Sequence, residues 1–339
     1  MPRPTLQTIA TKLGISKMTV SRALRGEAHV QADLRERIKA AAEAMGYRPD
    51  PEIAKLMTHM RQARRREAPR TLAFVWSEST ETPVTSSSWG GQLLTGARQR
   101  AERLGFQLVE FHLAEKGMSP RRLSSILEAR GIPGFVLSPL VSRSRGHVSM
   151  HWAKFSSVVI GLGYARPAMH RVHHHHFLGM MTALRRLKKL GYRRIGFVSS
   201  STTNERMFRA WSASFVAHHP LPMKQASELC LLDKDLTRGA FLRWLSVARV
   251  DALIDASDRT FGWLKEFKIP EKLGYITLAW QPNRPHIAGI DQQAEVLGAA
   301  AVDLLVEQFH SNERGVPEHP KILMTEGIWR DGETIQKLD

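Results

Sequence analysis

Short apolar runs alternate with amphipathic segments of helical length from residue 70 onward. Residues 71–76 (TLAFVW), 106–111 and 134–138 have the composition of buried strands, and residues 91–104 and 121–130 between them have helical periodicity. The alternation continues with strands at 158–161, 194–199 and 251–254 and helices at 179–190, 209–218, 238–247 and 261–267. Repeated units of this size predict parallel sheets with helices on both faces. Such sheets bind ligands beyond the carboxyl ends of their strands.

The first 50 residues have a different pattern, which predicts three short helices. Ile9, Ala10, Leu13, Val20 and Leu24 fall at helical spacing and can share one small core. Thr5 and Ser16 are favourable N-caps, and Gly14 suits the positive φ that ends a helix. A third helix is expected over residues 32–45, ending at Gly46.

The second of these helices is expected to expose side chains typical of a helix that reads DNA, all of them polar except Met18. They are Lys17, Met18, Thr19, Ser21, Arg22 and Arg25. Such side chains reach base edges and phosphates when a helix lies in a major groove. Residues 1–68 hold 14 Lys and Arg against 7 Asp and Glu, a net +7, and the other 271 residues carry the remaining +10 of the chain's +17. Charge is therefore densest where the predicted DNA-reading helices lie.

Several motifs resemble the LacI/GalR (lactose-repressor) family. The run TVSRALRG (19–26) with a following helix and GYRP (46–49) is similar to the family headpiece. LGYRRIGF (190–197), VDALIDASD (250–258) and residues 289–305 resemble motifs of its effector domain. The resemblance implies an all-α helix-turn-helix headpiece (1–50), a hinge helix and linker (51–69), and a two-lobed α/β periplasmic-binding-protein-like domain with parallel sheets (70–339) for effector binding and dimerisation. It also implies three lobe crossovers, near 162–166, 286–290 and 321–325.

The resemblance also assigns a set of DNA-contacting residues. In the family, a hinge leucine is wedged into the minor groove, and Leu56 falls at that position. Pro51, Glu52 and Ile53 depart from the family pattern there, so the alternative is that Leu56 packs only against Leu56 of the partner subunit. The full predicted set is Thr5, Ser16, Lys17, Met18, Thr19, Ser21, Arg22, Arg25, His29, Tyr47 and Leu56.

The predicted ligand residues all lie in the larger domain, and each has an alternative structural role. Asp258 matches the family's ligand aspartate but can instead cap a helix. Arg206 and Arg209 both fit the position of a ligand-binding arginine, or are solvated helix charges. Trp280 can stack on a sugar or belong to the core. Ser86, Ser88 and Trp89 follow the first strand, where a polar turn is the alternative.

Other motifs are weaker and favour neither a metal site nor an enzyme. His173, His174, His175 and His176 are consecutive, and adjacent side chains in extended chain point to opposite sides, so four cannot converge on one ion. Gly161 and Gly163 lack the third glycine of a dinucleotide loop. Cys230 is the one cysteine, so no internal disulfide forms, and it is expected in a buried strand. The common hydrolase, nucleotide and zinc motifs are absent, and no cofactor is expected.

The sequence thus predicts a cytoplasmic homodimer that binds operator DNA under the control of a small molecule, a sugar or sugar derivative by family analogy. No signal peptide or membrane-spanning run is recognised. Two alternatives stay open: a two-lobed solute-binding module, and a repressor that has lost its effector site. The second alternative arises because His175 and His176 replace the Asp-Asn pair usual in the family.

Overall fold

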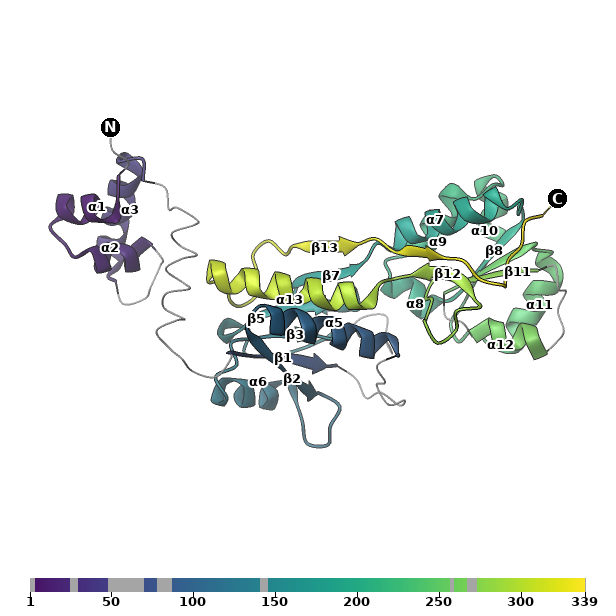
Figure 1. Ribbon diagram of the computed structural model, residues 1–339, viewed down its shortest axis with the longest axis horizontal. Helices are drawn as coiled ribbons and strands as arrows, with labels where there is room; N and C mark the ends of the chain where they lie inside the picture. Colours follow the sequence, from purple (N-terminus) through teal and green to yellow (C-terminus); the bar gives the residue numbers. More distant parts are fainter. Residues whose placement is uncertain are drawn as a thin grey trace. The chain divides into compact units, whose positions relative to one another are not determined.

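The computed structural model divides into two compact units, residues 1–67 and 68–339 (Figure 1). The structure describes residues 4–24, 30–47, 70–77, 87–140, 146–256, 259–266 and 273–338. The predicted hinge and linker, 51–69, lie outside the described residues. So do five of the predicted site residues: Arg25, His29, Leu56, Ser86 and Asp258.

The described residues of the N-terminal unit form three helices, α1 (Leu6–Leu13), α2 (Lys17–Leu24) and α3 (Ala32–Ala44). Thr5 caps α1 through a reciprocal pair of bonds with Thr8, and Gly14 ends it at φ +67°. The Ser16 hydroxyl accepts the Thr19 amide at 3.0 Å and so caps α2. These caps and the expected apolar core, completed by Ile38 of α3, confirm the helices predicted from spacing.

Within its described residues the larger unit contains two six-stranded sheets, each the centre of one lobe (Figure 1). The order in the first lobe is β13-β7-β5-β3-β1-β2 and in the second β14-β12-β11-β10-β8-β9. All pairings within them are parallel except β12 with β14. Parallel sheets with helices on both faces agree with the predicted fold class.

The elements of the first lobe are β1 (Arg70–Trp76), α5 (Trp89–Arg103), β2 (Phe106–His112), α6 (Pro120–Ala129), β3 (Gly134–Leu137), β4 (Gly146–His147), the 3-10 helix η1 (Trp152–Lys154), β5 (Ser156–Ile160), β6 (Tyr164–Arg166), β7 (His170–His174), α13 (Ala294–Ser311) and β13 (Ile322–Thr325). Those of the second lobe are α7 (His176–Lys189), β8 (Ile195–Ser200), α8 (Ser201–Arg206), α9 (Ala210–His218), α10 (Met223–Glu228), β9 (Cys230–Asp233), α11 (Arg238–Ala248), β10 (Ala252–Asp255), α12 (Arg259–Glu266), β11 (Gly274–Thr277), β12 (Ala288–Asp291) and β14 (Ile328–Arg330).

Alternation along each strand divides the core of a lobe into two layers. On β1, Leu72 and Phe74 face α5 and α13, whereas Ala73 and Val75 face α6. In the second lobe, Phe197 of β8 packs with α7 and α9, whereas its neighbour Val198 packs with α11. Strands that are buried on both faces have continuous apolar sequences. The apolar runs in the sequence therefore predicted most of these strands.

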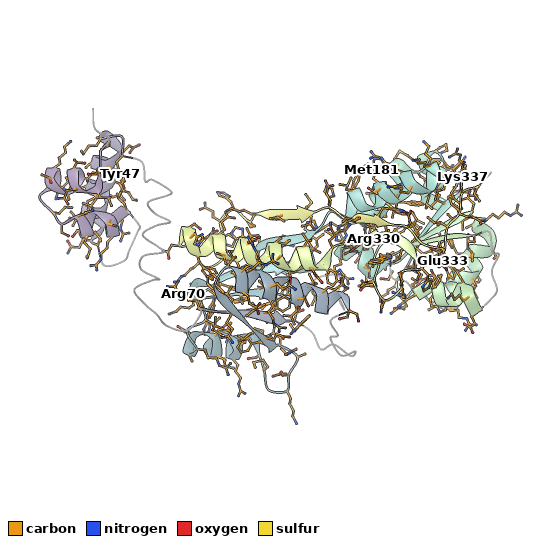
Figure 2. All side chains as sticks on the ribbon, in the orientation of Figure 1. Tyr47, Arg70, Met181, Arg330, Glu333 and Lys337 are labelled. Atoms are coloured by element: carbon orange, nitrogen blue, oxygen red, sulfur yellow. The ribbon has the colours of Figure 1, made fainter. Side chains whose placement is uncertain are left out.

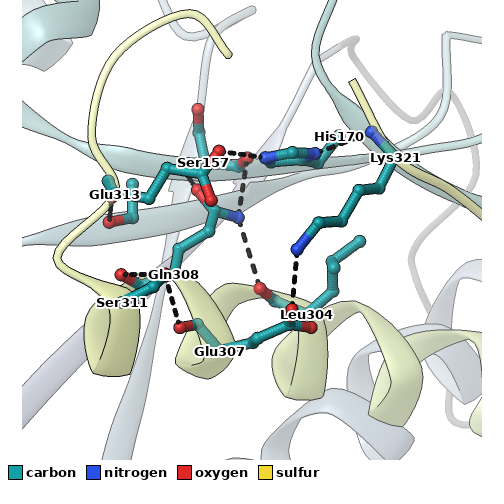
Figure 3. Close-up of polar contacts among 9 residues, drawn as sticks. Ser157, His170, Leu304, Glu307, Gln308, Ser311, Glu313 and Lys321 are labelled. Carbon is teal, nitrogen blue, oxygen red and sulfur yellow. Dashed lines mark hydrogen bonds and ion pairs between the residues drawn. The ribbon is translucent and has the colours of Figure 1, made fainter. Parts of the chain in front are cut away.

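A polar network attaches the C-terminal end of α13 to the first sheet (Figure 3). The Gln308 side chain accepts the Ser157 amide at 3.1 Å and donates to the Ser157 carbonyl at 3.3 Å. His170 accepts the Lys321 amide through Nδ1 at 2.9 Å. Its Nε2 therefore carries the proton and donates to Glu313 at 2.7 Å.

The chain crosses between the lobes at 174–176, 291–294 and 325–328. The expected first crossover at 162–166 is wrong, because β7 pairs with β5 and β13 and so keeps residues up to 174 in the first lobe. The other two observed crossovers lie a few residues after their expected positions. The crossovers leave β7, β12 and β13 from their carboxyl ends, so the carboxyl edges of both sheets meet at this junction.

Cys230 lies in a strand as expected, but it is only partly buried, because β9 is the edge strand of the second sheet. Burial still raises the pKa of its thiol to about 12.

Candidate functional site

The exposed side of α2 is the candidate nucleic-acid interface. Val20 and Ala23 are buried against α1 and α3, which leaves Lys17, Met18 and Arg22 exposed on the opposite face. Met18 is 62% exposed, although a methionine of a small domain would ordinarily be buried. An exposed apolar side chain between two cations suits a helix that reads thymine methyls and phosphates.

The other predicted DNA-contacting residues that are described in this unit cap helices or pack against its core. Thr5 and Ser16 cap their helices, and the Ser16 hydroxyl lies 2.8 Å from that of Thr19. Ser21 is partly buried, and the ring of Tyr47 packs against the core of the unit. The capping side chains can reach a phosphate only through their exposed atoms. Lys17, Met18 and Arg22 are therefore the strongest candidates for base contact.

The lobe junction is the candidate ligand site, because the carboxyl ends of both sheets meet there. Of the two candidate arginines, Arg206 lies at this junction. A Cβ placed on Gly163 of the first lobe would lie 3.4 Å from Arg206 Cδ. Arg209 is exposed and adopts φ +60° before α9. The structure therefore favours Arg206 over Arg209 as the ligand-facing arginine.

The remaining described ligand candidates have structural contacts as well. Ser88 caps α5 by accepting the Gly91 amide at 3.1 Å. Trp89 packs against the first-lobe core, and its indole nitrogen is buried without a hydrogen-bond partner among the described residues. The Trp280 ring lies 5.2 Å beneath the guanidinium of Arg330 (labelled in Figure 2), which also bonds Asp291 at 2.8 Å. This contact places a cation over the indole face on which a sugar was expected to stack.

Asp255, which was not among the predicted site residues, places a carboxylate at the end of β10. Its Oδ2 accepts the Thr260 amide at 2.9 Å, the Thr260 hydroxyl at 2.6 Å and the Tyr275 hydroxyl at 3.0 Å. Asp255 thus accepts a backbone amide of the first turn of α12, while Asp258, for which capping was the alternative role, lies outside the described residues. The position of Asp255 as the last residue of a strand, before a helix, was the available signal.

Three of the four consecutive histidines lie together at the first crossover. The rings of His173 and His176 are stacked at 5.8 Å, and His174 meets His176 edge-on at 5.2 Å. Burial, then the neighbouring histidines, lowers the pKa of His174 to about 4. Burial also lowers the pKa of His173 and His176. Within the described residues no group of His, Cys, Asp or Glu is arranged to hold a metal ion.

A cavity of about 680 Å³ opens on the first lobe, lined by residues 147–149, Trp152 and residues 165–168. It contains none of the predicted ligand residues. Among the described residues, no helix has both the length and the apolar character to cross a bilayer.

Comparison with known proteins gives one family model and several relatives. Residues 5–50 match the model described as bacterial regulatory proteins, lacI family. The transcriptional regulator CelR of Thermobifida fusca is 31% identical over 138 residues, which are 41% of this chain and 38% of CelR. RafR of Escherichia coli is 53% identical over 53 residues, 16% of each chain. The chain therefore aligns in sequence with about two fifths or less of these relatives' length.

Solved structures extend the likeness to the whole chain. The complex of the regulator CelR with cellobiose has a TM-score of 0.58 at 22% identity, covering 98% of this chain and 100% of that one. The lac repressor dimer bound to operator and the anti-inducer ONPF has a TM-score of 0.55 at 16% identity, covering 98% and 99%. At these identities the structures establish a shared fold, and the relatives named above are transcriptional regulators rather than enzymes. The N-terminal domain thus matches the lacI family of bacterial regulatory proteins, and the larger unit shares the two-lobed fold of the CelR and lac repressor structures.

Proposed function

We propose that this protein is a cytoplasmic, homodimeric transcription regulator that binds a specific DNA operator. A small molecule, a sugar or sugar derivative, binds at the lobe junction and changes its operator affinity. The observation that carries the proposal is the exposed face of α2, where Lys17, Met18 and Arg22 stand on a helix capped and packed as a rigid unit.

Effector control requires only that the ligand binds one arrangement of the two lobes more tightly than another. Three chain crossings join the lobes, so a change in the arrangement of the two lobes affects all three crossings at once. Two structural neighbours support a small-molecule effector: one is a complex with cellobiose and the other contains an anti-inducer.

The test concerns Arg22. The full-length protein first selects a binding site from a library of random duplexes. Arg22→Ala should then weaken binding to the selected site by about 10- to 100-fold, because a bidentate arginine–guanine contact contributes roughly 1–3 kcal/mol of discrimination. Binding to a scrambled duplex of equal length should fall far less.

Arg37→Ala is the matched control, since Arg37 is an equally charged, exposed residue of α3. It should weaken binding to both duplexes slightly and equally. Equal losses on both duplexes for Arg22→Ala would make Arg22 a phosphate contact. Failure to enrich any site would refute sequence-specific binding altogether.

A further inference from the structure

Six basic residues are concentrated within ten positions of the second lobe, at the end of α7 and in the turn that leads to β8 (Figure 1). They are Arg185, Arg186, Lys188, Lys189, Arg193 and Arg194, and we call them the basic cluster. All six residues are exposed, because Leu184 and Leu187 take the buried positions of this part of α7. The longer stretch 129–204 around the cluster contains no Asp or Glu. Such a density of like charge produces a strong positive potential at the surface.

Two carboxylates lie beside the basic cluster and offset part of its charge. Asp251 Oδ2 accepts the backbone amides of Arg193 and Arg194 at 2.7 and 2.9 Å. Asp331 accepts from the indole of Trp329 at 2.6 Å, and one guanidinium of the cluster lies 5.9 Å from the centre of that ring. Among the described residues, no ion pair joins a cluster side chain to a carboxylate. The six cations therefore exceed the two neighbouring carboxylates by four charges.

Three side chains of the basic cluster have no polar partner in the part of the chain that the structure describes. They are those of Arg185, Lys188 and Lys189. Cations in the last turn of a helix stabilise it through the helix dipole. However, Arg185 and Lys189 are like charges at positions i and i+4, which repel each other. Stabilisation of α7 therefore does not account for so many cations, and these three side chains are available to a partner.

The other residues of the 185–194 segment indicate which polyanion the basic cluster suits. Proteins bind single-stranded nucleic acids through aromatic rings on which the bases stack, but Tyr192, the one aromatic residue of the segment, is fully buried. Membrane binding requires exposed apolar side chains that enter the bilayer, and no large apolar residue of this fully described segment is exposed. A surface of cations alone suits the phosphates of a duplex, whose bases are stacked inside.

We propose that the basic cluster is a second DNA-binding surface, which contacts the phosphates of duplex DNA without reading the base sequence. The inference goes beyond the proposed function, in which α2 binds the operator. The two surfaces belong to separate compact units of one chain, so DNA binding by one unit raises the local concentration of DNA for the other. Contacts to phosphates alone release counterions, and their affinity therefore depends steeply on salt.

The test gives α2 and the basic cluster different duplexes. The full-length protein is first bound to its selected operator on a biosensor surface, and a random-sequence duplex then flows over it. The parent protein should capture the random duplex. Arg185→Gln/Lys188→Gln/Lys189→Gln should still occupy the operator but capture the random duplex about 10- to 100-fold more weakly. The slope of log K against log salt concentration should fall by roughly 2 to 3, about one for each lost cation.

Lys116→Gln/Arg121→Gln/Arg122→Gln is the matched control, because it removes the same three charges from exposed positions of the first lobe. This variant should capture the random duplex like the parent protein. Equal losses in the two triple variants would reduce the effect to overall net charge and overturn the proposed surface. A parent protein that occupies the operator but captures no random duplex would also overturn it, and would leave the proposed function standing.

Two further probes identify the class of polyanion. They are a single-stranded RNA with as many phosphates as the duplex, and vesicles that contain phosphatidylserine. Duplex DNA should be captured most tightly, because its charge density is higher than that of a single strand and the basic cluster offers neither rings for stacking nor apolar side chains for insertion. Tighter capture of the RNA or of the vesicles would overturn the assignment of duplex DNA as the partner.

Discussion

At the scale of single residues, Gln308 shows how one buried amide completes a sheet. Pairing of β5 with β7 begins at Val158, and the Gln308 amide satisfies the backbone of Ser157 one residue earlier (Figure 3). Gln308→Leu should lower the free energy of unfolding of the larger unit by about 1–3 kcal/mol, the cost of leaving a buried donor unsatisfied. Urea denaturation followed by tryptophan fluorescence measures this.

The neighbouring residue provides the control for Gln308. Glu307 bonds Lys321 at 2.7 Å, but both side chains are more than half exposed. Water screens such a pair, so Glu307→Gln should leave the urea midpoint nearly unchanged. A Gln308→Leu protein as stable as Glu307→Gln would show that the buried amide contributes nothing.

At the scale of elements, α5 and α13 pack with their backbones in contact (Figure 1). A Cβ on Gly298 would overlap the carbonyl of Leu93, and one on Gly96 would overlap that of Glu295. Helix propensity alone predicts that Gly298→Ala stabilises by up to about 1 kcal/mol. We expect the opposite sign, a loss of about 1–3 kcal/mol, because the two helices must separate.

Gly262 of α12 is the matched control for Gly298, because an added Cβ there meets no atom within 4 Å. Gly262→Ala should stabilise the larger unit, and thermal unfolding of both variants gives the two signs directly. Stabilisation by Gly298→Ala as well would mean that α5 and α13 are not held at this separation.

At the scale of the whole larger unit, the buried histidines at the first crossover link stability to pH. His174 faces Asp291, His173, His175 and the backbone of Thr325, and burial dominates in lowering its pKa to about 4. The native state therefore keeps this imidazole neutral, while the unfolded chain binds a proton below its ordinary pKa of about 6.5. Stability is full above pH 6.5 and falls as the pH drops toward 4.

His174 alone should cost about 2 kcal/mol of stability between pH 7 and pH 5. Urea denaturation at both pH values measures the change, before most carboxylates titrate. His174→Gln should remove the part of the dependence that His174 contributes and leave the part that comes from His173 and His176, whose pKa values burial also lowers. Lys321→Gln, which does not titrate in this range, should preserve the whole dependence. A pH dependence that survives His174→Gln unchanged would assign it to other groups.

Local sequence signals were enough to predict the helices of the N-terminal unit and most strands and helices of the larger unit. The caps at Thr5 and Ser16 and the left-handed turn at Gly14 depend on residues within a few positions of each other. The buried strands are continuous apolar runs because helices cover both faces of their sheets. Family motifs extended these signals to the two-lobed architecture.

Only the tertiary structure decided which distant segments meet at the junction. Strand β7, HRVHH, has no apolar pattern, and it is buried because β5 and β13 pair on either side of it. Likewise Arg206 rather than Arg209 reaches Gly163 of the opposite lobe. These outcomes depend on contacts between segments far apart in the chain, such as Arg171 and Ile322, which are 151 residues apart. No pattern within a single segment encodes such a pairing.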